Sequence, residues 1–327
     1  MTTNLSSALW EPRIGRWFTF AALSLIVLNP VFISSRPVAP GMAFGAPLGD
    51  DAPAPTRTLP PAHAIGSKQI PSKPPLDSRS RLAVRSRIAL VVDANTSEEL
   101  LVKDASRVVP IASITKLMTA MVVLDAKLPL EEMLKISDDD RDTVMATGSR
   151  LRVGSALSRT DMLHLALMSS ENRAAAALSR YFPGGRPAFI NAMNAKAVEL
   201  GMAHTHFVSP NGLTNENVSS AYDLAKLVRA ASQYPLIREF TTDPHYDVRI
   251  GRYVLPFYNS DRLVGRPDWD IEVQKTGFTN AAGRCLVLLV NVEGRSLIMV
   301  FLDAYGKLTR FADARRVLMQ MAVLEKK

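Results

Sequence analysis

The position of the strand-like segments constrains the fold of this chain more than any other feature. These segments lie at both ends of the part able to fold, and they enclose a helical middle. Residues 86–93 are rich in β-branched side chains, and after a turn residues 99–103 predict a second strand, so the two form a β-hairpin. Near the other end, three further strands are predicted at residues 270–275, 284–292 and 296–302. Both ends of the chain therefore contribute to one sheet.

The middle of the chain carries apolar residues at helical spacing. From Pro110 to about Asp125 the residues are apolar nearly all round, which indicates a helix buried in the core. Further helices are predicted at residues 160–168, 173–181, 187–200, 221–233 and 309–325. The pattern predicts an α+β fold, in which an antiparallel sheet built from both chain ends is covered by helices and carries a helical lobe at one edge.

The N-terminal region predicts export. Arg13 and Arg16 precede an apolar stretch at residues 17–33, and a basic start before a short apolar core is typical of a secretory signal. Residues 1–34 are therefore expected to be a signal peptide, or alternatively an uncleaved membrane anchor. Residues 35–82 hold 10 of the 21 prolines and predict a disordered linker, so the folded domain is expected at residues 83–327, outside the cytoplasm and in the periplasm.

The charge balance restricts the partners. The formal net charge is +8, but no dense Lys/Arg run with interleaved aromatic residues occurs, so no nucleic-acid partner is predicted. A basic surface would attract an anionic wall polymer or a phospholipid surface, which allows peripheral or N-terminal membrane association. Cys285 is the only cysteine and lies in an apolar run, so we expect a buried, inert thiol and no intramolecular disulfide.

Three short motifs carry the chemistry. In chain order they are S-x-x-K at Ser113 to Lys116, S-x-N at Ser170 to Asn172, and K-T-G at Lys275-Thr276-Gly277. Together they form the signature set of penicillin-binding proteins and class A β-lactamases. S-x-x-K alone is weak because about one chance match is expected in this length, whereas K-T-G is rare. The order and setting of the three motifs make the combination specific.

The first motif predicts a serine nucleophile. Ser113 is expected at the start of the buried helix, where free N–H groups and the helix dipole favour developing negative charge. Lys116 lies one turn later on the same face and can remove the Ser113 proton if its pKa is depressed. Burial and the second cation, Lys275, would lower that pKa.

The other two motifs predict the rest of the site. Ser170 and Asn172 fall where the helical pattern pauses, so Ser170 could relay a proton and Asn172 could hold Lys116 or a substrate amide. Lys275 and Thr276 would bind a carboxylate. Gly277 would let a substrate backbone lie alongside the strand. The N–H groups of Ser113 and Phe278 would form an oxyanion hole. The turn at Ser209-Pro-Asn211 also matches S-x-N, but it is better explained as turn chemistry.

Other chemistries are not supported. The five histidines form no metal-binding pattern, and no dinucleotide or phosphate-binding glycine motif occurs. The acidic cluster at residues 138–142 lacks EF-hand spacing, so a solvated turn is preferred over a calcium site. No metal or cofactor is predicted.

From about Ile88 to Phe311 the chain resembles the D-alanyl-D-alanine carboxypeptidase/endopeptidase family, the low-molecular-mass penicillin-binding serine peptidases. Beyond the motifs, the resemblance rests on residues 110–120, 207–213 and 275–283. It implies a β-lactamase/transpeptidase-like fold without metal or cofactor, with peptidoglycan peptides as substrates and β-lactam antibiotics as covalent inhibitors. It also implies acylation of Ser113, with Lys116 as base. Glu171 departs from the Gly or Asp of many members, and we expect it to alter substrate preference.

The layout resembles the endopeptidase branch. The chain ends 50 residues after Gly277, and residues 168–175 also match that branch, which cleaves cross-links between D-alanine and diaminopimelate. A D,D-carboxypeptidase is the nearest alternative. A class A β-lactamase is disfavoured because no glutamate is evident that could position a deacylating water. A non-catalytic penicillin-binding sensor is disfavoured by the intact motif set.

Overall fold

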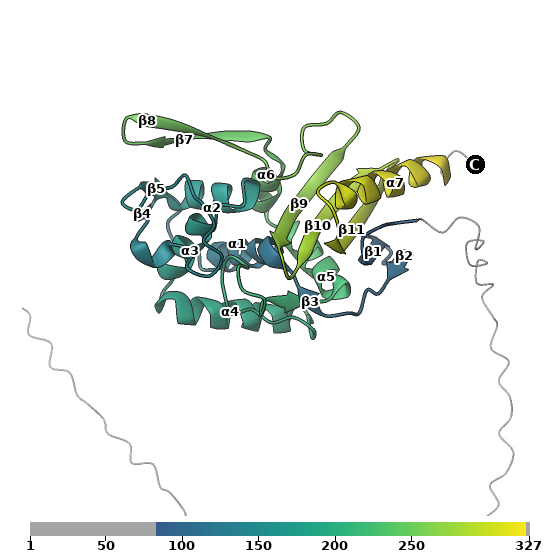
Figure 1. Ribbon diagram of the computed structural model, residues 1–327, viewed down its shortest axis with the longest axis horizontal. Coiled ribbons are helices and arrows are strands. Elements are labelled where there is room, and N and C mark those ends of the chain that lie inside the picture. The colour runs from purple at the N-terminus through teal and green to yellow at the C-terminus, as the bar shows by residue number, and fades with distance from the viewer. Residues whose placement is uncertain (1–82, 325–327) are drawn as a thin grey trace, which may run out of the picture. The chain divides into compact units, whose positions relative to one another are not determined.

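A computed structural model describes residues 83–324 (Figure 1). The expected signal segment and linker, residues 1–34 and 35–82, lie outside the described residues. Five strands form one antiparallel sheet in the order β2-β1-β11-β10-β9. They are β1 (Ile88–Asp93), β2 (Glu99–Lys103), β9 (Asp270–Thr279), β10 (Gly283–Val292) and β11 (Arg295–Ala304). Strand β1 pairs with β11, so the predicted assembly of the sheet from both chain ends is confirmed.

Alternate side chains of the sheet point into two hydrophobic cores. One face, with Leu90 and Val300, packs in the same core as α5 (Ala221–Ala231) and the lobe helices. The other face, with Val91 and Met299, packs against α7 (Thr309–Leu324). The period of two along each strand therefore buries both faces of the sheet between helices.

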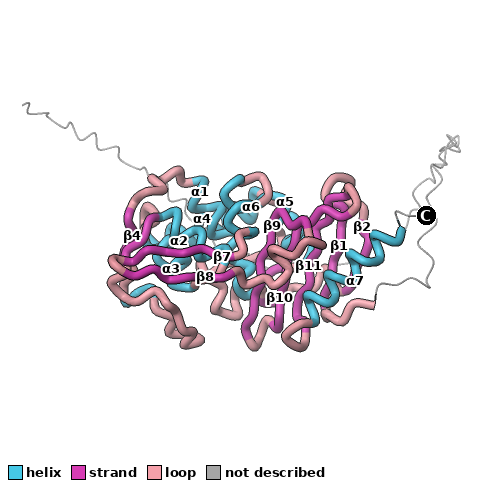
Figure 2. Tube along the Cα trace, turned by 90° about the horizontal axis from the view of Figure 1, so that it is seen from above, coloured by secondary structure: helices cyan, strands magenta, loops and turns pink. Residues whose placement is uncertain are grey.

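The helical lobe lies beyond the β9 edge of the sheet (Figures 1 and 2). It contains α1 (Thr115–Asp125), α2 (Arg159–Met168), α3 (Asn172–Arg180), α4 (Gly185–Glu199) and α6 (Pro235–Thr242). Two small antiparallel pairs accompany it: β4 (Met133–Lys135) with β5 (Ala156–Ser158), and β7 (His245–Ile250) with β8 (Tyr253–Tyr258). The predicted α+β class and its lobe are confirmed.

Two predicted boundaries are wrong at positions that matter for the site. The buried helix begins at Thr115 rather than Pro110, because Val109–Pro110 forms a short strand (β3) that pairs with Val218–Ser219 (β6) and a 3₁₀ turn follows. The strand expected to end at Lys275 continues to Thr279. Both differences arise from tertiary pairing, which overrides local pattern.

Within residues 83–324, no helix combines the length and the apolar character that crossing a membrane requires.

Candidate active site

Ser113 and Lys116 are adjacent in space as well as in sequence. Ser113 lies in the 3₁₀ turn Ala112–Ile114, and Lys116 is the second residue of α1. The Lys116 Nζ is 2.8 Å from Ser113 Oγ, and it donates to Asn172 Oδ1 and to the carbonyl oxygen of Asn211, also at 2.8 Å. The first two motifs therefore meet at the Lys116 amine.

The environment of Lys116 strongly disfavours its charged form. The side chain is completely buried. Burial lowers the pKa of Lys116 well below its ordinary value, and the positive charge of Lys275 lowers it further, while Glu171 opposes both effects. This pKa direction is the one a lysine needs in order to accept a proton near neutral pH.

A second chain segment holds the turn that carries Ser113. Ala112 has a φ of 49°, which is incompatible with an α-helix, so α1 cannot include this residue and begins at Thr115. Gly212 passes so close that a Cβ on it would lie 2.0 Å from the Ala112 oxygen, so only glycine fits. Thr115 Oγ1 donates to the same oxygen and accepts a hydrogen bond from Asn217 Nδ2.

Residues of the second motif lie at the junction between α2 and α3. Asn172 is the first residue of α3, and its Nδ2 donates to Thr147 Oγ1 at 3.0 Å. Ser170 is half-buried with a φ of 62°, an uncommon conformation for a residue with a side chain. Within residues 83–324 its hydroxyl has no protein hydrogen-bond partner. Glu171 caps α3 by accepting from the Arg173 N–H, and it also accepts from Ser149 Oγ.

Strand β9 brings the third motif against the serine turn. Because Lys275 and Gly277 are two residues apart, they lie on the same face of β9, and Gly277 faces the turn that carries Ser113. A Cβ on Gly277 would lie 3.0 Å from the Ile111 oxygen and 3.3 Å from the Ser113 nitrogen. Thr276 points the other way and donates to Ser260 Oγ at 2.7 Å. The motif occupies the interior of the strand rather than its end, which is what allows this close approach.

Lys275 is the second buried cation of the site. It is completely buried, and its Nζ donates to the Thr276 carbonyl oxygen at 3.1 Å. Burial lowers the pKa of Lys275 to about 7, a shift that Asp261 opposes and Arg310 reinforces.

The sequence analysis missed two charged residues near Lys275. Asp261 is buried, and burial raises its pKa to about 6; its Oδ2 has no hydrogen-bond partner in the described part of the chain. Arg310 is also buried, its Nε likewise lacks a partner among these residues, and burial lowers its pKa to about 10. Nothing in the sequence marks either residue, since each lies in a loop or helix far from the motifs.

Phe278 follows the motif on the exposed side of β9. Half of its surface is accessible, and the Arg284 guanidinium lies 4.2 Å from the centre of its ring. The side chain therefore lies at the rim of the site, while the backbone runs beside the serine turn.

The sequence analysis also missed the role of the segment at residues 207–211. The backbone bends at Pro210 and Asn211, the Asn211 carbonyl binds Lys116, and the Pro210 carbonyl accepts from Thr119 Oγ1. These contacts use backbone oxygens, which every residue carries, so residue identity holds no signal for them. The only usable signal was Gly212, whose lack of a side chain permits the approach.

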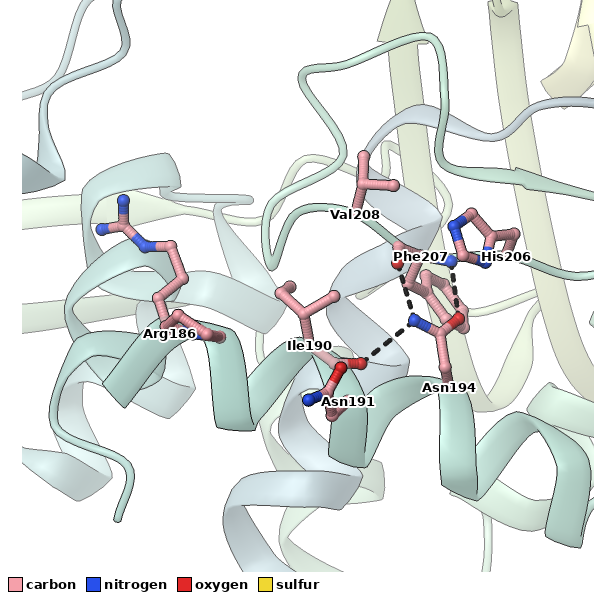
Figure 3. A pocket seen from close by; sticks show the side chains of 8 residues that line it. Arg186, Ile190, Asn191, Asn194, His206, Phe207 and Val208 are labelled. Atoms are coloured by element: carbon pink, nitrogen blue, oxygen red, sulfur yellow. Dashed lines mark hydrogen bonds between the residues drawn. The ribbon is translucent and has the colours of Figure 1, made fainter. Parts of the chain in front are cut away.

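An open groove of about 580 Å³ lies against the same segment (Figure 3). None of the predicted site residues lines it. Asn194 on α4 donates to the Phe207 carbonyl at 2.7 Å and accepts from the Phe207 N–H at 2.9 Å. These bonds hold the segment that leads to Asn211 in place. The groove residues therefore help to position the active site but do not form it. Its lining residues are Arg186, Pro187, Ile190, Asn191, Asn194, His206, Phe207 and Val208.

Protein groups contact the carboxylates of three of the four aspartates at residues 138–142, namely Asp138, Asp140 and Asp142. Asp140 accepts from Arg180 and from the Ser137 N–H, and Asp142 accepts from N–H groups of the following loop. Among residues 83–324, no group of three or more His, Cys, Asp or Glu side chains is arranged to hold a metal ion.

The fold defines the class of protein. The structure is similar to penicillin-binding protein D2 from Listeria monocytogenes in its ampicillin-bound form, with a TM-score of 0.64 and 30% identity over 74% of this chain and 99% of that one. The class is thus that of the penicillin-binding peptidases.

Sequence comparison narrows the class to a family. Residues 74–306 match the model of the D-alanyl-D-alanine carboxypeptidase family, and the chain belongs to that family. The chain is 51% identical to a D-alanyl-D-alanine endopeptidase from Pseudomonas aeruginosa, over 76% of this chain and 80% of the relative. It is 50% identical to the D-alanyl-D-alanine endopeptidase from Escherichia coli, over 73% and 77%.

Proposed function

We propose that the protein is a serine D,D-endopeptidase that hydrolyses D-alanyl–diaminopimelate cross-links in peptidoglycan through an acyl-enzyme on Ser113. The observation that carries the proposal is the Lys116 amine, which lies 2.8 Å from Ser113 Oγ in a buried setting that lowers its pKa. The two relatives named D-alanyl-D-alanine endopeptidase support the choice of bond.

Neutral Lys116 acts as the base in this mechanism. It takes the Ser113 proton as Oγ attacks the D-alanine carbonyl carbon, and the resulting oxyanion is stabilised by the N–H groups of Ser113 and Phe278. Ser170 relays the proton to the leaving amine of diaminopimelate, which breaks the peptide bond. A water then attacks the acyl-enzyme, with Lys116 again as base, and regenerates Ser113.

Positive charge orients the substrate. We assign Lys275 and Thr276 to binding a substrate carboxylate, Lys275 by its charge and Thr276 by its hydroxyl, which lies on the opposite face of β9 beside Ser260 Oγ. Arg310 adds to the positive electrostatic potential at this place, because it acts on Lys275 electrostatically and its Nε has no partner among the described residues. Gly277 leaves room for the peptide backbone beside the strand, and Asn172 holds Lys116 or contacts the substrate amide.

A D,D-carboxypeptidase is the second candidate. The family model bears that name, and the same site would release a terminal D-alanine if a free amino acid, rather than a cross-linked peptide, filled the leaving-group side. A class A β-lactamase and a non-catalytic sensor remain weaker alternatives. β-Lactams would acylate Ser113 in all four cases, so acylation alone does not distinguish them.

The proposed substrate places the protein outside the cytoplasm. Peptidoglycan lies there, and the basic and apolar N-terminus favours export to the periplasm, with residues 1–34 as signal peptide or anchor. Residues 35–82 would then be a linker, and residues 83–327 the catalytic domain. N-terminal or peripheral membrane association belongs to the same proposal.

Purified protein, incubated with a cross-linked muropeptide dimer and separately with a free pentapeptide, tests the function. Products are followed by mass spectrometry, with Ser113→Ala as control. Dimer cleavage that is lost in the control is the expected result. Release of D-alanine from the pentapeptide alone would establish the carboxypeptidase. Stable acylation by penicillin without hydrolysis of either peptide would support the non-catalytic sensor instead.

A further inference from the structure

The loop at residues 142–151 is built around one carboxylate. Asp142 Oδ1 accepts the N–H groups of Val144 and Met145, each at 2.9 Å. Its Oδ2 accepts the Thr147 N–H at 2.8 Å and the Thr147 hydroxyl at 2.7 Å. Burial opposes ionisation, but these hydrogen bonds outweigh it and lower the pKa of Asp142 below its ordinary value. The carboxylate is therefore charged at neutral pH and can only accept hydrogen bonds.

This loop connects Asp142 to the base of the active site. The Thr147 hydroxyl donates its single proton to Asp142, so towards Asn172 it can only accept, and Asn172 Nδ2 donates to it at 3.0 Å. With its NH₂ group turned to Thr147, Asn172 presents Oδ1 to Lys116 Nζ at 2.8 Å. The hydrogen-bond direction of the whole chain is set at Asp142.

We propose that Asp142 and Thr147 are positioning residues for acylation, which hold the Asn172 amide with its oxygen towards Lys116. The inference rests on the proposed function, in which Lys116 is the base for Ser113. Neither residue touches the reacting atoms; both act through Asn172. A reversed amide would point an N–H donor at the lysine and remove one of its acceptors.

A second set of contacts fixes the loop to the same motif. Ser149 Oγ donates to Glu171 Oε1 at 2.7 Å, and Arg173 donates to the Leu151 carbonyl at 2.6 Å. The loop therefore remains docked when the Asp142–Thr147 contact alone is altered, which makes that contact testable separately from loop folding.

Two isosteric changes test the chain of hydrogen bonds. In Asp142→Asn one acceptor oxygen becomes an NH₂ donor, so N–H donors face each other in either amide orientation. With the NH₂ towards Thr147, the contact to Thr147 is broken or reversed; with the NH₂ towards Val144 and Met145, the two hydrogen bonds that hold the start of the loop are lost. Thr147→Val removes the hydroxyl but keeps the shape. Two variants serve as controls. Thr147→Ser keeps a hydroxyl at position 147, and Asp139→Asn removes the charge of an exposed aspartate that takes no part in these hydrogen bonds.

The readout is the second-order rate constant for acylation of the full-length protein by a fluorescent penicillin, measured from pH 5 to pH 10. The charged groups that face Lys116 are Lys275 on β9 and Glu171 before α3, and none of the variants changes either. Asp142→Asn and Thr147→Val are expected to lower the plateau rate about tenfold or more, because small displacements of a catalytic base are costly. Thr147→Ser and Asp139→Asn should remain within about twofold of the wild type.

The pH profile separates positioning from loosening of the loop. Loss of the Asn172 oxygen destabilises the Lys116 ammonium, so its pKa falls and the acidic limb moves to lower pH. A loosened loop would admit water and raise that pKa, which moves the limb to higher pH. Three outcomes would overturn the inference. The acidic limb of the acylation profile could move to higher pH, or Thr147→Ser could be as defective as Thr147→Val. Alternatively, Asp142→Asn and Thr147→Val could both acylate at the wild-type rate. Acylation that survives Ser113→Ala would instead overturn the proposed function.

Discussion

At the scale of single residues, two completely buried lysines face the same serine turn. Lys116 has three oxygen atoms around its amine, whereas Lys275 bonds one carbonyl oxygen and receives electrostatic support from Asp261. Burial lowers both pKa values, and the charge of Lys275 adds to the shift of Lys116. The site therefore uses one lysine to tune the other.

Replacing Lys275 by methionine should change activity and stability in opposite directions. Without its charge the pKa of Lys116 rises, so the acidic limb of the acylation profile moves to higher pH, and carboxylate binding is lost. The folded-state pKa of Lys275, about 7, lies below its ordinary value of 10.5, so stability of the wild type rises between these pH values. Lys275→Met should thus stabilise the fold by ~1–4 kcal/mol at pH 6, and by less at pH 9.

Urea unfolding at both pH values and penicillin acylation across pH measure these effects. Lys135→Met, at an exposed lysine, is the matched control and should change neither quantity. An unchanged pH profile in Lys275→Met would show that Lys275 does not act on Lys116.

At the scale of elements, a single aspartate joins the segment that precedes β1 to the last helix, α7. Asp313 on α7 is completely buried, and it accepts from the Ser86 N–H and hydroxyl at 2.7 Å and from the Arg85 N–H at 2.9 Å. Arg316 binds the same carboxylate. These contacts join segments 227 residues apart, on the sheet face opposite the lobe.

Asp313→Ala should therefore destabilise the fold without altering the active site. The buried Ser86 groups would lose their acceptor, for a loss of about 3 kcal/mol in the free energy of unfolding. Chemical denaturation measures the loss, and the acylation rate of the folded protein should be unchanged. Asp268→Ala, which removes a solvent-exposed partner of Arg315, should change stability by less than about 1 kcal/mol. Equal losses in the two variants would contradict the role of Asp313.

The elements differ in how clearly the sequence announces them. The apolar strands of the sheet and the helices of the lobe other than α6 were predicted within a few residues, because their side chains face a core with a regular period. The hairpin of β7 and β8 was missed: most of its side chains are at least partly exposed, and Pro256 lies within β8. Helix α6 was also missed, because it is short and Pro235 at its first position is a weak signal by itself.

At the scale of the whole molecule, the five-stranded sheet is complete only when strands from the beginning and the end of the folded domain pair. Ile88 on β1 lies opposite Leu302 on β11, and β10 lies next to β11 in the interior of the sheet. Such long-range pairing cannot form locally, so these strands are expected to unfold as one cooperative unit.

Cys285 on β10 reports this cooperativity. The thiol is completely buried, and burial raises its pKa to about 12, so it should not react with thiol reagents in the native state. Labelling measured by mass spectrometry across a urea series should follow global unfolding monitored by circular dichroism. Rapid labelling without denaturant would show that the sheet opens locally, against this expectation.

The sequence by itself determined the class of fold, the three motifs and the pairing of Ser113 with Lys116, because these depend on local periodicity and on residues one helical turn apart. Only the tertiary structure decided the start of α1, the passage of β9 beside Ser113 and the contact of Lys116 with the Asn211 carbonyl. It also decided that Arg310 lies near Lys275, and that hydrogen bonds connect Asp142 through Thr147 to Asn172. These depend on backbone oxygens and on segments distant in sequence, whose meeting no local pattern encodes.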